Sequence, residues 1–344
     1  MKNTENLNKI VLFSKPTGKT SFSSLWTIKH AFNTTKVGHT GTLDSFASGL
    51  LVVCVGSLTR LAGRITEFDK SYQAVIEFGS ETDTLECTGQ VVRTALLPAK
   101  DAFVKAFESF RGELDQVPPA FSAIHVDGKR ASDLVRSGKE AEIPARKIKV
   151  YQSNICDMLL DDEGFVKAAL VEFTVSKGTY IRSLARDIGL ACNSAAHLMA
   201  LRRTRVGNFE LKDACGFDLL EPFTIQNAIV NKKFLLENPI DQNHKETALE
   251  KDSVQEKSLQ EQIRNNSIEM NKIIASNCGF GILTLKEKFK DSFYNGQKLH
   301  SNMFDSSPFE VENDFAAVFL ENGFFAGLLH KDQNGYFKYA FVQH

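Results

Sequence analysis

The chain has 344 residues, 42% of them hydrophobic and 24% charged, and its net charge at pH 7 is −1. These proportions are typical of a globular protein of about two domains, and the near-neutral charge excludes a strongly basic, nonspecific polyanion binder. The longest apolar run, Leu50–Val55, is far shorter than the roughly 20 residues of a membrane-spanning helix, and no secretion signal follows Met1, so membrane and secreted proteins are excluded.

Apolar periodicity predicts strands and helices along the first two thirds of the chain. Strands are predicted at 9–13, 50–55, 72–78 and 168–175, and helices at 21–32, 101–110 and 183–191. Ser21 is the expected N-cap of the first helix. Because strands outnumber helices and no regular strand–helix–strand repeat is visible, the pattern favours a mixed α+β sheet over a doubly wound one.

The composition changes at Asn238. From there to about Asn277 the chain is rich in Gln, Glu, Lys, Asn and Ser and lacks aromatic residues, which predicts a solvated helix or a disordered linker. Residues 280–344 are rich in Phe and contain Asn-Gly turns, which predicts a small β domain.

The six cysteines are scattered and form no C-x-x-C pair, so neither a zinc ribbon nor a redox pair is encoded. Cysteines in this arrangement favour reduced, structural thiols and therefore a cytoplasmic protein. We expect no metal site and no cofactor.

The segment Gly18-Lys-Thr-Ser21 resembles the end of a phosphate-binding loop. The full motif, G-x-x-x-x-G-K-S/T, would place its first glycine at position 13, which is Phe13. Without that glycine the backbone cannot easily curl around a triphosphate, so a strand-to-helix turn is favoured over a nucleotide hydrolase.

The segment from Val37 to Leu51 contains three glycines, His39 and Asp44 directly before a buried strand. Such a loop lets the backbone approach a ligand closely while it presents one carboxylate. Taken alone, however, Asp44 is more often a turn or cap residue, and His39 a satisfied polar group.

Four sequence motifs, in the same order as in a known family, indicate a function for Asp44 and His39. Gly38-His-Thr-Gly-Thr-Leu-Asp44, followed by Ala47-Ser-Gly-Leu-Leu51, resembles the catalytic motif of the TruB family of tRNA pseudouridine synthases. Further segments resemble the same family at 15–21, 69–72 and 176–183, the last followed by Leu201-Arg-Arg203. The resemblance covers about residues 9–215. It departs from the family pattern at Ser45, Glu86, His125 and Ser132.

The resemblance implies an isomerase that converts uridine 55 in the T-loop of tRNA to pseudouridine without a cofactor. It implies a mixed, largely antiparallel sheet with flanking helices. Asp44 would be the nucleophile on a flipped-out base, held by Arg182 in an ion pair. Tyr72 would stack on the base and could remove the C5 proton. His39, Tyr180 and Leu201 would complete the substrate pocket.

The resemblance also implies a division of the chain and a set of partners. Residues 7–237 would form the catalytic domain with a mobile RNA-contacting insertion at 118–138, residues 238–278 the polar linker or helix, and residues 279–344 a small domain similar to the PUA domain. Expected contacts to the RNA backbone are Lys147, Lys149, Arg202, Arg203 and Arg205. The partner would be the T-stem-loop of tRNA, with no membrane and no protein partner, and the protein a monomer.

One alternative from another class stays open at this point: a noncatalytic module that folds tRNA with the same surface. The trio Asp44, Tyr72 and Arg182 favours the enzyme, because binding alone would not need it.

Overall fold

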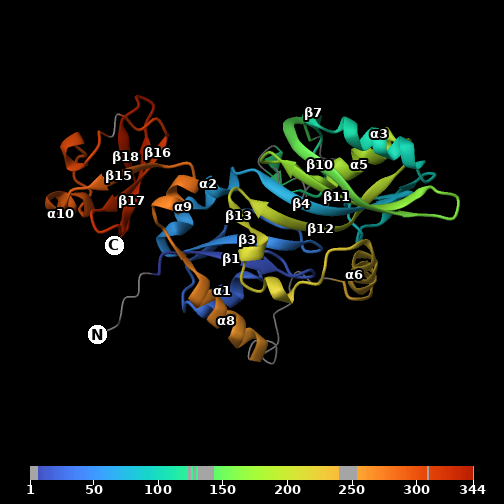
Figure 1. Cartoon of the computed structure of the whole chain (residues 1–344), viewed down its shortest axis with the longest axis horizontal. Coiled ribbons are helices and arrows are strands. Elements are labelled where there is room, and N and C mark those ends of the chain that lie inside the picture. Colours follow the sequence, from blue (N-terminus) through green and yellow to red (C-terminus); the bar gives the residue numbers. More distant parts are fainter. Residues whose placement is uncertain are drawn as a thin grey trace.

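The computed structural model describes residues 7–122, 125–126, 129–130, 143–239, 254–307 and 310–343. Two sheets organise the chain, a ten-stranded sheet and a four-stranded sheet at one end of the molecule (Figure 1). Among these residues no helix is long and apolar enough to cross a membrane.

The large sheet has the strand order β14-β1-β3-β12-β4-β11-β10-β7, with β2 added to β3 and β13 to β12. Its strands are β1 (Lys9–Lys15), β2 (Val37–His39), β3 (Ser48–Val55), β4 (Lys70–Phe78), β7 (Gly112–Gln116), β10 (Arg146–Leu160), β11 (Val166–Val175), β12 (Ala196–Val206), β13 (Phe209–Glu210) and β14 (Ile268–Glu269). The β3–β12 pair is parallel, whereas the other pairs of this sheet are antiparallel. The predicted α+β class with a mixed, largely antiparallel sheet is therefore confirmed.

Two short hairpins lie outside the large sheet. They are formed by β5 (Ser80–Thr82) with β6 (Val91–Thr94), and by β8 (His125–Val126) with β9 (Lys129–Arg130). The second hairpin falls in the predicted insertion at 118–138, most of which lies outside the described residues.

Helices α3 (Lys100–Ser109) and α5 (Ile181–Ala191) cover one face of the sheet. Phe103 and Phe107 of α3 are buried against sheet residues such as Phe173, and Leu184 of α5 joins the same core. Burial of each such side chain contributes roughly 1.5–3 kcal/mol to the free energy of unfolding. Tyr72 packs against this core, so we call this side the Tyr72 face.

The opposite face is covered by α6 (Ile225–Glu237), whose Ile225 and Ala228 pack on Val75 and Met199. Helices α1 (Leu25–Ala31) and α8 (Val254–Asn266) pack together beside β1. The first helix begins at Leu25 and not at Ser21, so the prediction of Ser21 as N-cap is wrong: its hydroxyl binds the backbone of Leu43 instead.

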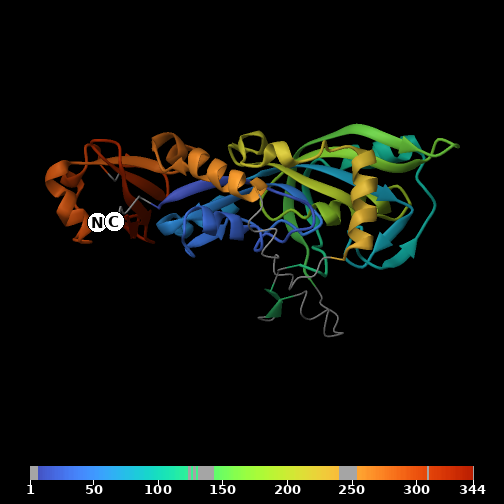
Figure 2. The same cartoon turned by 90° about the horizontal axis from the view of Figure 1, so that it is seen from below.

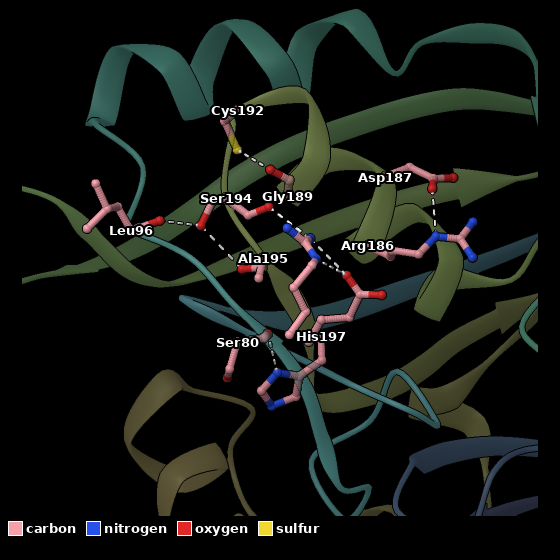
Figure 3. A network of polar contacts seen from close by, with 11 residues as sticks. Ser80, Leu96, Arg186, Asp187, Gly189, Cys192, Ser194, Ala195 and His197 are labelled. Carbon is pink, nitrogen blue, oxygen red and sulfur yellow. Dashed lines mark hydrogen bonds and ion pairs between the residues drawn. The ribbon is translucent and has the colours of Figure 1, made fainter.

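Polar contacts fix the turn that joins α5 to β12 (Figure 3). The Ser194 hydroxyl donates to the carbonyl of Leu96 at 2.7 Å, and His197 Nδ1 lies 2.9 Å from the carbonyl of Ser80. Because α5 carries Arg182 near its first turn and β12 carries Leu201, this turn sets two candidate site residues relative to each other.

The C-terminal sheet has the order β15-β16-β17-β18 and shares a core with the large sheet. Its strands are β15 (Gly281–Leu285), β16 (Phe315–Leu320), β17 (Phe325–Lys331) and β18 (Phe337–Val342). Helix α9 (Lys272–Asn277) precedes β15, and α10 (Lys290–Tyr294) lies between β15 and β16. The guanidinium of Arg64 in α2 (Ala62–Thr66) stacks 3.6 Å from the ring centre of Phe315. Figure 1 shows this sheet beside α2, at the end of the molecule away from α3 and α6, and Figure 2 shows the same arrangement from below. The expected C-terminal β-rich region is thus present.

The polar segment predicted at 238–278 contains α8, β14 and α9. Its residues 240–253 lie outside the described part of the chain.

Candidate active site

Asp44 lies in the loop that connects β2 to β3, at the edge of the Tyr72 face. The loop is held by short bonds on both sides of Asp44: the Ser21 hydroxyl bonds to the backbone nitrogen and oxygen of Leu43, and the amide of Gly18 donates to the carbonyl of Ser45 at 2.9 Å. The Asp44 side chain itself is 36% exposed. A fixed loop therefore presents a carboxylate that solvent or a ligand can reach.

Arg182, near the first turn of α5, is the ion-pair partner of Asp44. Its Nε lies 3.1 Å from Oδ2, and its Nη2 donates to Oδ1 at 3.4 Å. Tighter hydrogen bonds run from the guanidinium to the carbonyls of Thr84 at 2.9 Å and Phe121 at 3.1 Å. The Arg182 guanidinium is thus held mainly by the backbone carbonyls of Thr84 and Phe121. The Asp44 carboxylate can therefore also contact a substrate.

Tyr72 stands on β4 with its ring packed against the core of the Tyr72 face. Its cross-strand partner on β12 is Arg203, and Leu201 on the same strand is opposite Ala74. Burial raises the pKa of the Tyr72 phenol, while the charge of Arg203 opposes that shift. Tyr72 is therefore a neutral phenol at pH 7.

His39 ends β2 just before the loop. Burial, followed by the charge of Arg203, lowers its pKa, so its imidazole is neutral at pH 7. Its Nδ1 is buried and has no hydrogen-bond partner among the described residues.

Tyr180 precedes α5, where the Gln116 side chain bonds to both its backbone nitrogen and its carbonyl oxygen, at 2.8 and 3.0 Å. The guanidinium of Arg146 lies 4.7 Å from the ring centre of Tyr180 and donates to the carbonyl of Gly178. The strand β10 and the loop before α5 thereby fix the Tyr180 ring.

Two titratable groups near Asp44 were not singled out by the sequence as site residues. Burial and the neighbouring charge of Asp44 raise the pKa of Glu86 to about 7, against the effect of Arg182. Burial lowers the pKa of Lys15 to about 7, although its ammonium donates to the carbonyls of Pro16 and Lys19 at 3.0 and 2.6 Å. The signal for Lys15 was its place in the motif at 15–21, which does not reveal that the side chain is buried.

The predicted RNA-backbone contacts do not form one surface. Arg203 is only 3% exposed, so the prediction that it contacts phosphate is wrong. Arg202 and Arg205 pair with Gln73 and Ser71, which lie on the face opposite Tyr72, because side chains alternate along a strand. Arg202 and Arg205 therefore share a face with each other and not with Arg203, and their contact with RNA stays a prediction.

The side chains of Arg202 and Arg205 already donate hydrogen bonds to other protein groups. Arg202 donates to Ser48 Oγ and to the carbonyl of Glu221, and Arg205 to Ser71 Oγ and the carbonyl of Gly207. Lys147 and Lys149 are exposed on β10, and their contact with RNA stays a prediction.

Comparison with protein families places the chain among known enzymes. Residues 29–181 match the family described as "TruB family pseudouridylate synthase (N terminal domain)", and residues 182–238 match the "tRNA pseudouridylate synthase B C-terminal domain". The chain is 41% identical over 334 residues to the tRNA pseudouridine synthase B of Treponema denticola, which covers 92% of this chain and 91% of that protein. It is 46% identical over 208 residues to the protein of that name from Borreliella burgdorferi strain ZS7, covering 60% of this chain and 72% of that protein.

Solved structures share the fold. The chain is similar to one in the crystal structure of a Cbf5-Nop10-Gar1 complex, with a TM-score of 0.61 at 22% identity, over 98% of this chain and 85% of that chain. A chain of an archaeal box H/ACA Nop10-Cbf5 complex matches with a TM-score of 0.60 at 20% identity, over 98% of this chain and 87% of that chain.

Proposed function

Because this chain belongs to the TruB family and is a tRNA pseudouridine synthase, we propose that its target is uridine 55 of the T-loop and that Asp44 is its nucleophile. The observation that supports the second part is the ion pair of the exposed Asp44 carboxylate with the buried Arg182 guanidinium. An arginine in this place holds the carboxylate in a fixed orientation.

The reaction rearranges one nucleotide. The bond from uracil N1 to ribose C1′ breaks, the uracil turns, and a bond from C5 to C1′ forms; C5 loses a proton and N1 gains one. Substrate and product have the same composition, so no oxidant, reductant or group donor enters. Asp44 would bond to the ribose or the base while the two are separated, and then leave.

The other predicted residues would act around this step. Tyr72 would stack on the uracil, and as a phenol it must first lose its own proton before it can take the C5 proton. Neutral His39, with its unpartnered Nδ1, would contact the flipped-out nucleotide. Tyr180 and Leu201 would line the pocket. Unstacking the base costs a few kcal/mol, which these contacts would offset.

The test is incubation of the purified protein with an unmodified tRNA transcript, followed by mapping of pseudouridine at each position. Modification at position 55 alone is expected, and a transcript with cytidine at that position is the matched control. Modification elsewhere with position 55 unchanged would overturn the site, whereas tRNA refolding without any pseudouridine would favour the noncatalytic alternative.

A further inference from the structure

Arg203 is a buried cation that belongs to no ion pair among the described residues. Its side chain points to the Tyr72 face from β12, and the residue is 3% exposed. Burial of a charge lowers stability unless hydrogen bonds satisfy the charge. The hydrogen-bond partners of this guanidinium therefore indicate its role.

Two nitrogens of Arg203 donate to the backbone of the loop that carries Asp44, and the third donates to the strand β3 that follows the loop. Nη2 donates to the carbonyl of Gly41 at 3.1 Å, Nη1 to that of Thr42 at 3.3 Å, and Nε to that of Leu50 at 2.8 Å. Two of these carbonyls precede Asp44 and one follows it, so one side chain closes the loop across its base.

The main chain of Arg203 reinforces this closure. It lies in parallel register with Gly49 of β3, where a Cβ on the glycine would stand 2.3 Å from the Arg203 carbonyl oxygen. Gly49 also has a φ of +113°, which favours glycine. The two strands therefore approach each other closely where the loop ends.

The same guanidinium reaches the second wall of the site. Tyr72 is directly opposite Arg203 on β4, and the charge of the guanidinium acts on its phenol. The charged groups that act on Tyr72 are Arg203 from β12 and Asp44 from the loop, while its neighbour on β11 is the uncharged Phe173.

We infer that Arg203 is a positioning residue, which sets the Asp44 loop and the Tyr72 hydroxyl at a fixed distance from each other. The inference rests on the proposed roles of Asp44 and Tyr72. The inference does not depend on uridine 55 as the target, because the isomerisation of any uridine at this site would require the same placement of the Asp44 loop and Tyr72.

The test compares Arg203→Met with Arg111→Met. Arg111 is a matched control because its Nε donates to Ser153 Oγ at 3.0 Å and its Nη2 to the carbonyl of Ser153 at 2.5 Å, in the β7–β10 part of the sheet. Both changes remove a guanidinium that donates to a backbone carbonyl, from a buried residue in Arg203 and from an exposed one in Arg111. The measurements are the melting temperature, the Kd for tRNA and the single-turnover rate at saturating enzyme.

We expect Arg203→Met to bind tRNA within about threefold of the parent and to lose about 100-fold in rate, the cost of a misplacement of about 1 Å, while Arg111→Met loses stability alone. Arg203→Lys keeps the charge but has one nitrogen for three carbonyls, so its rate should be intermediate. A rate for Arg203→Met no lower than that of Arg111→Met overturns the inference. If Arg203→Met does not fold, Arg203→Lys decides: a rate about tenfold below the parent supports the role, and an unchanged rate overturns it.

A double-mutant cycle with Tyr72→Phe tests the second contact, because that variant keeps the ring and removes the hydroxyl. Arg203→Met should cost several-fold less in the Tyr72→Phe background than in the parent. If the rate of the double variant falls by the product of the two single-variant factors, the contact between Arg203 and Tyr72 has no catalytic role. All rates refer to the parent, so a parent that makes no pseudouridine refutes the proposed function, whereas an active parent with an active Arg203→Met refutes only this inference.

Discussion

The Nε atom of Arg182 lies 3.1 Å from Oδ2 of Asp44, although 138 positions separate the two residues in the chain. The pair joins the loop before β3 to the first turn of α5. Each residue of the pair is also held by other contacts. Ser21 holds the loop of Asp44, and the carbonyls of Thr84 and Phe121 hold the Arg182 guanidinium. The site is therefore organised before any substrate arrives.

Arg182→Lys should lower the single-turnover rate by about 100-fold or more, since an ammonium cannot bond to two carbonyls and a carboxylate in the planar pattern of a guanidinium. It should also cost about 1–3 kcal/mol of stability, because a buried carbonyl loses its donor. Arg186→Lys, one turn further along α5, is the control: Arg186 bonds to Asp187 and to the carbonyl of Val117. Equal rates for the two variants would remove Arg182 from the catalytic machinery.

Glu86→Gln should change how stability depends on pH. The pKa of Glu86 is about 7 in the folded protein against an ordinary 4.5, so the folded state binds the proton more tightly. Between these pH values Glu86 therefore costs the parent stability as the pH rises, by up to about 1.4 kcal/mol per pH unit, and Glu86→Gln should lack this contribution. Lys15, with its lowered pKa of about 7, titrates above this window.

Urea unfolding of the parent and of Glu86→Gln at several values between pH 4.5 and 7 checks this. Glu108→Gln on the outside of α3 is the control and should follow the parent. Parallel curves for the parent and Glu86→Gln would mean that Glu86 is already ionised at low pH.

The sequence predicted the strands β1, β3, β4 and β11, the class of the fold and the loop that holds Asp44. These features depend on local signals, namely alternating apolar residues and a glycine-rich segment before the apolar run of β3. The Asp44–Arg182 pair was expected from the family resemblance alone, because no local signal relates residues so far apart.

The direction of the arginines in β12 could not be predicted. The register of this strand shifts between Leu198 and Ala200 and again between Arg203 and Arg205, and each shift changes which side chains face the core. The run of arginines looked like one basic surface, whereas Arg202 and Arg203 point to opposite faces as neighbours in a strand, and the second shift places Arg205 on the face of Arg202. Likewise the hydroxyl of Ser21 was expected at the start of a helix, and its partner is a loop 22 residues away.

Activity should survive the removal of divalent metals. The reaction changes no oxidation state and transfers no group to a second molecule, and the sequence contains no spaced set of metal ligands. An RNA hairpin with the T-stem and loop, which folds by base pairing in monovalent salt, is the substrate of choice, because full-length tRNA uses magnesium for its own folding. Rates with and without excess chelator should agree within about twofold, and loss of activity that zinc restores would contradict the prediction.

Asp44→Asn separates the enzyme from a noncatalytic RNA-folding module. Asparagine keeps the size of the side chain and its capacity to serve in a turn, so the loop held through Ser21 and Arg203 should still fold. Binding of tRNA should persist or strengthen slightly, since one negative charge beside the RNA phosphates is removed. The single-turnover rate should fall by a factor on the order of a thousand or more, because an amide oxygen cannot replace a carboxylate nucleophile.

The measurements for Asp44→Asn are pseudouridine formed per enzyme in a single turnover, a tRNA binding curve and the melting temperature, with Asp101→Asn at the start of α3 as the control. Loss of turnover with intact binding is expected. Turnover near that of the parent would show that Asp44 is only a turn residue and is not the nucleophile. If binding and turnover fall together, the melting temperature decides, since a folded variant that no longer binds would place Asp44 in recognition and contradict a purely chemical role.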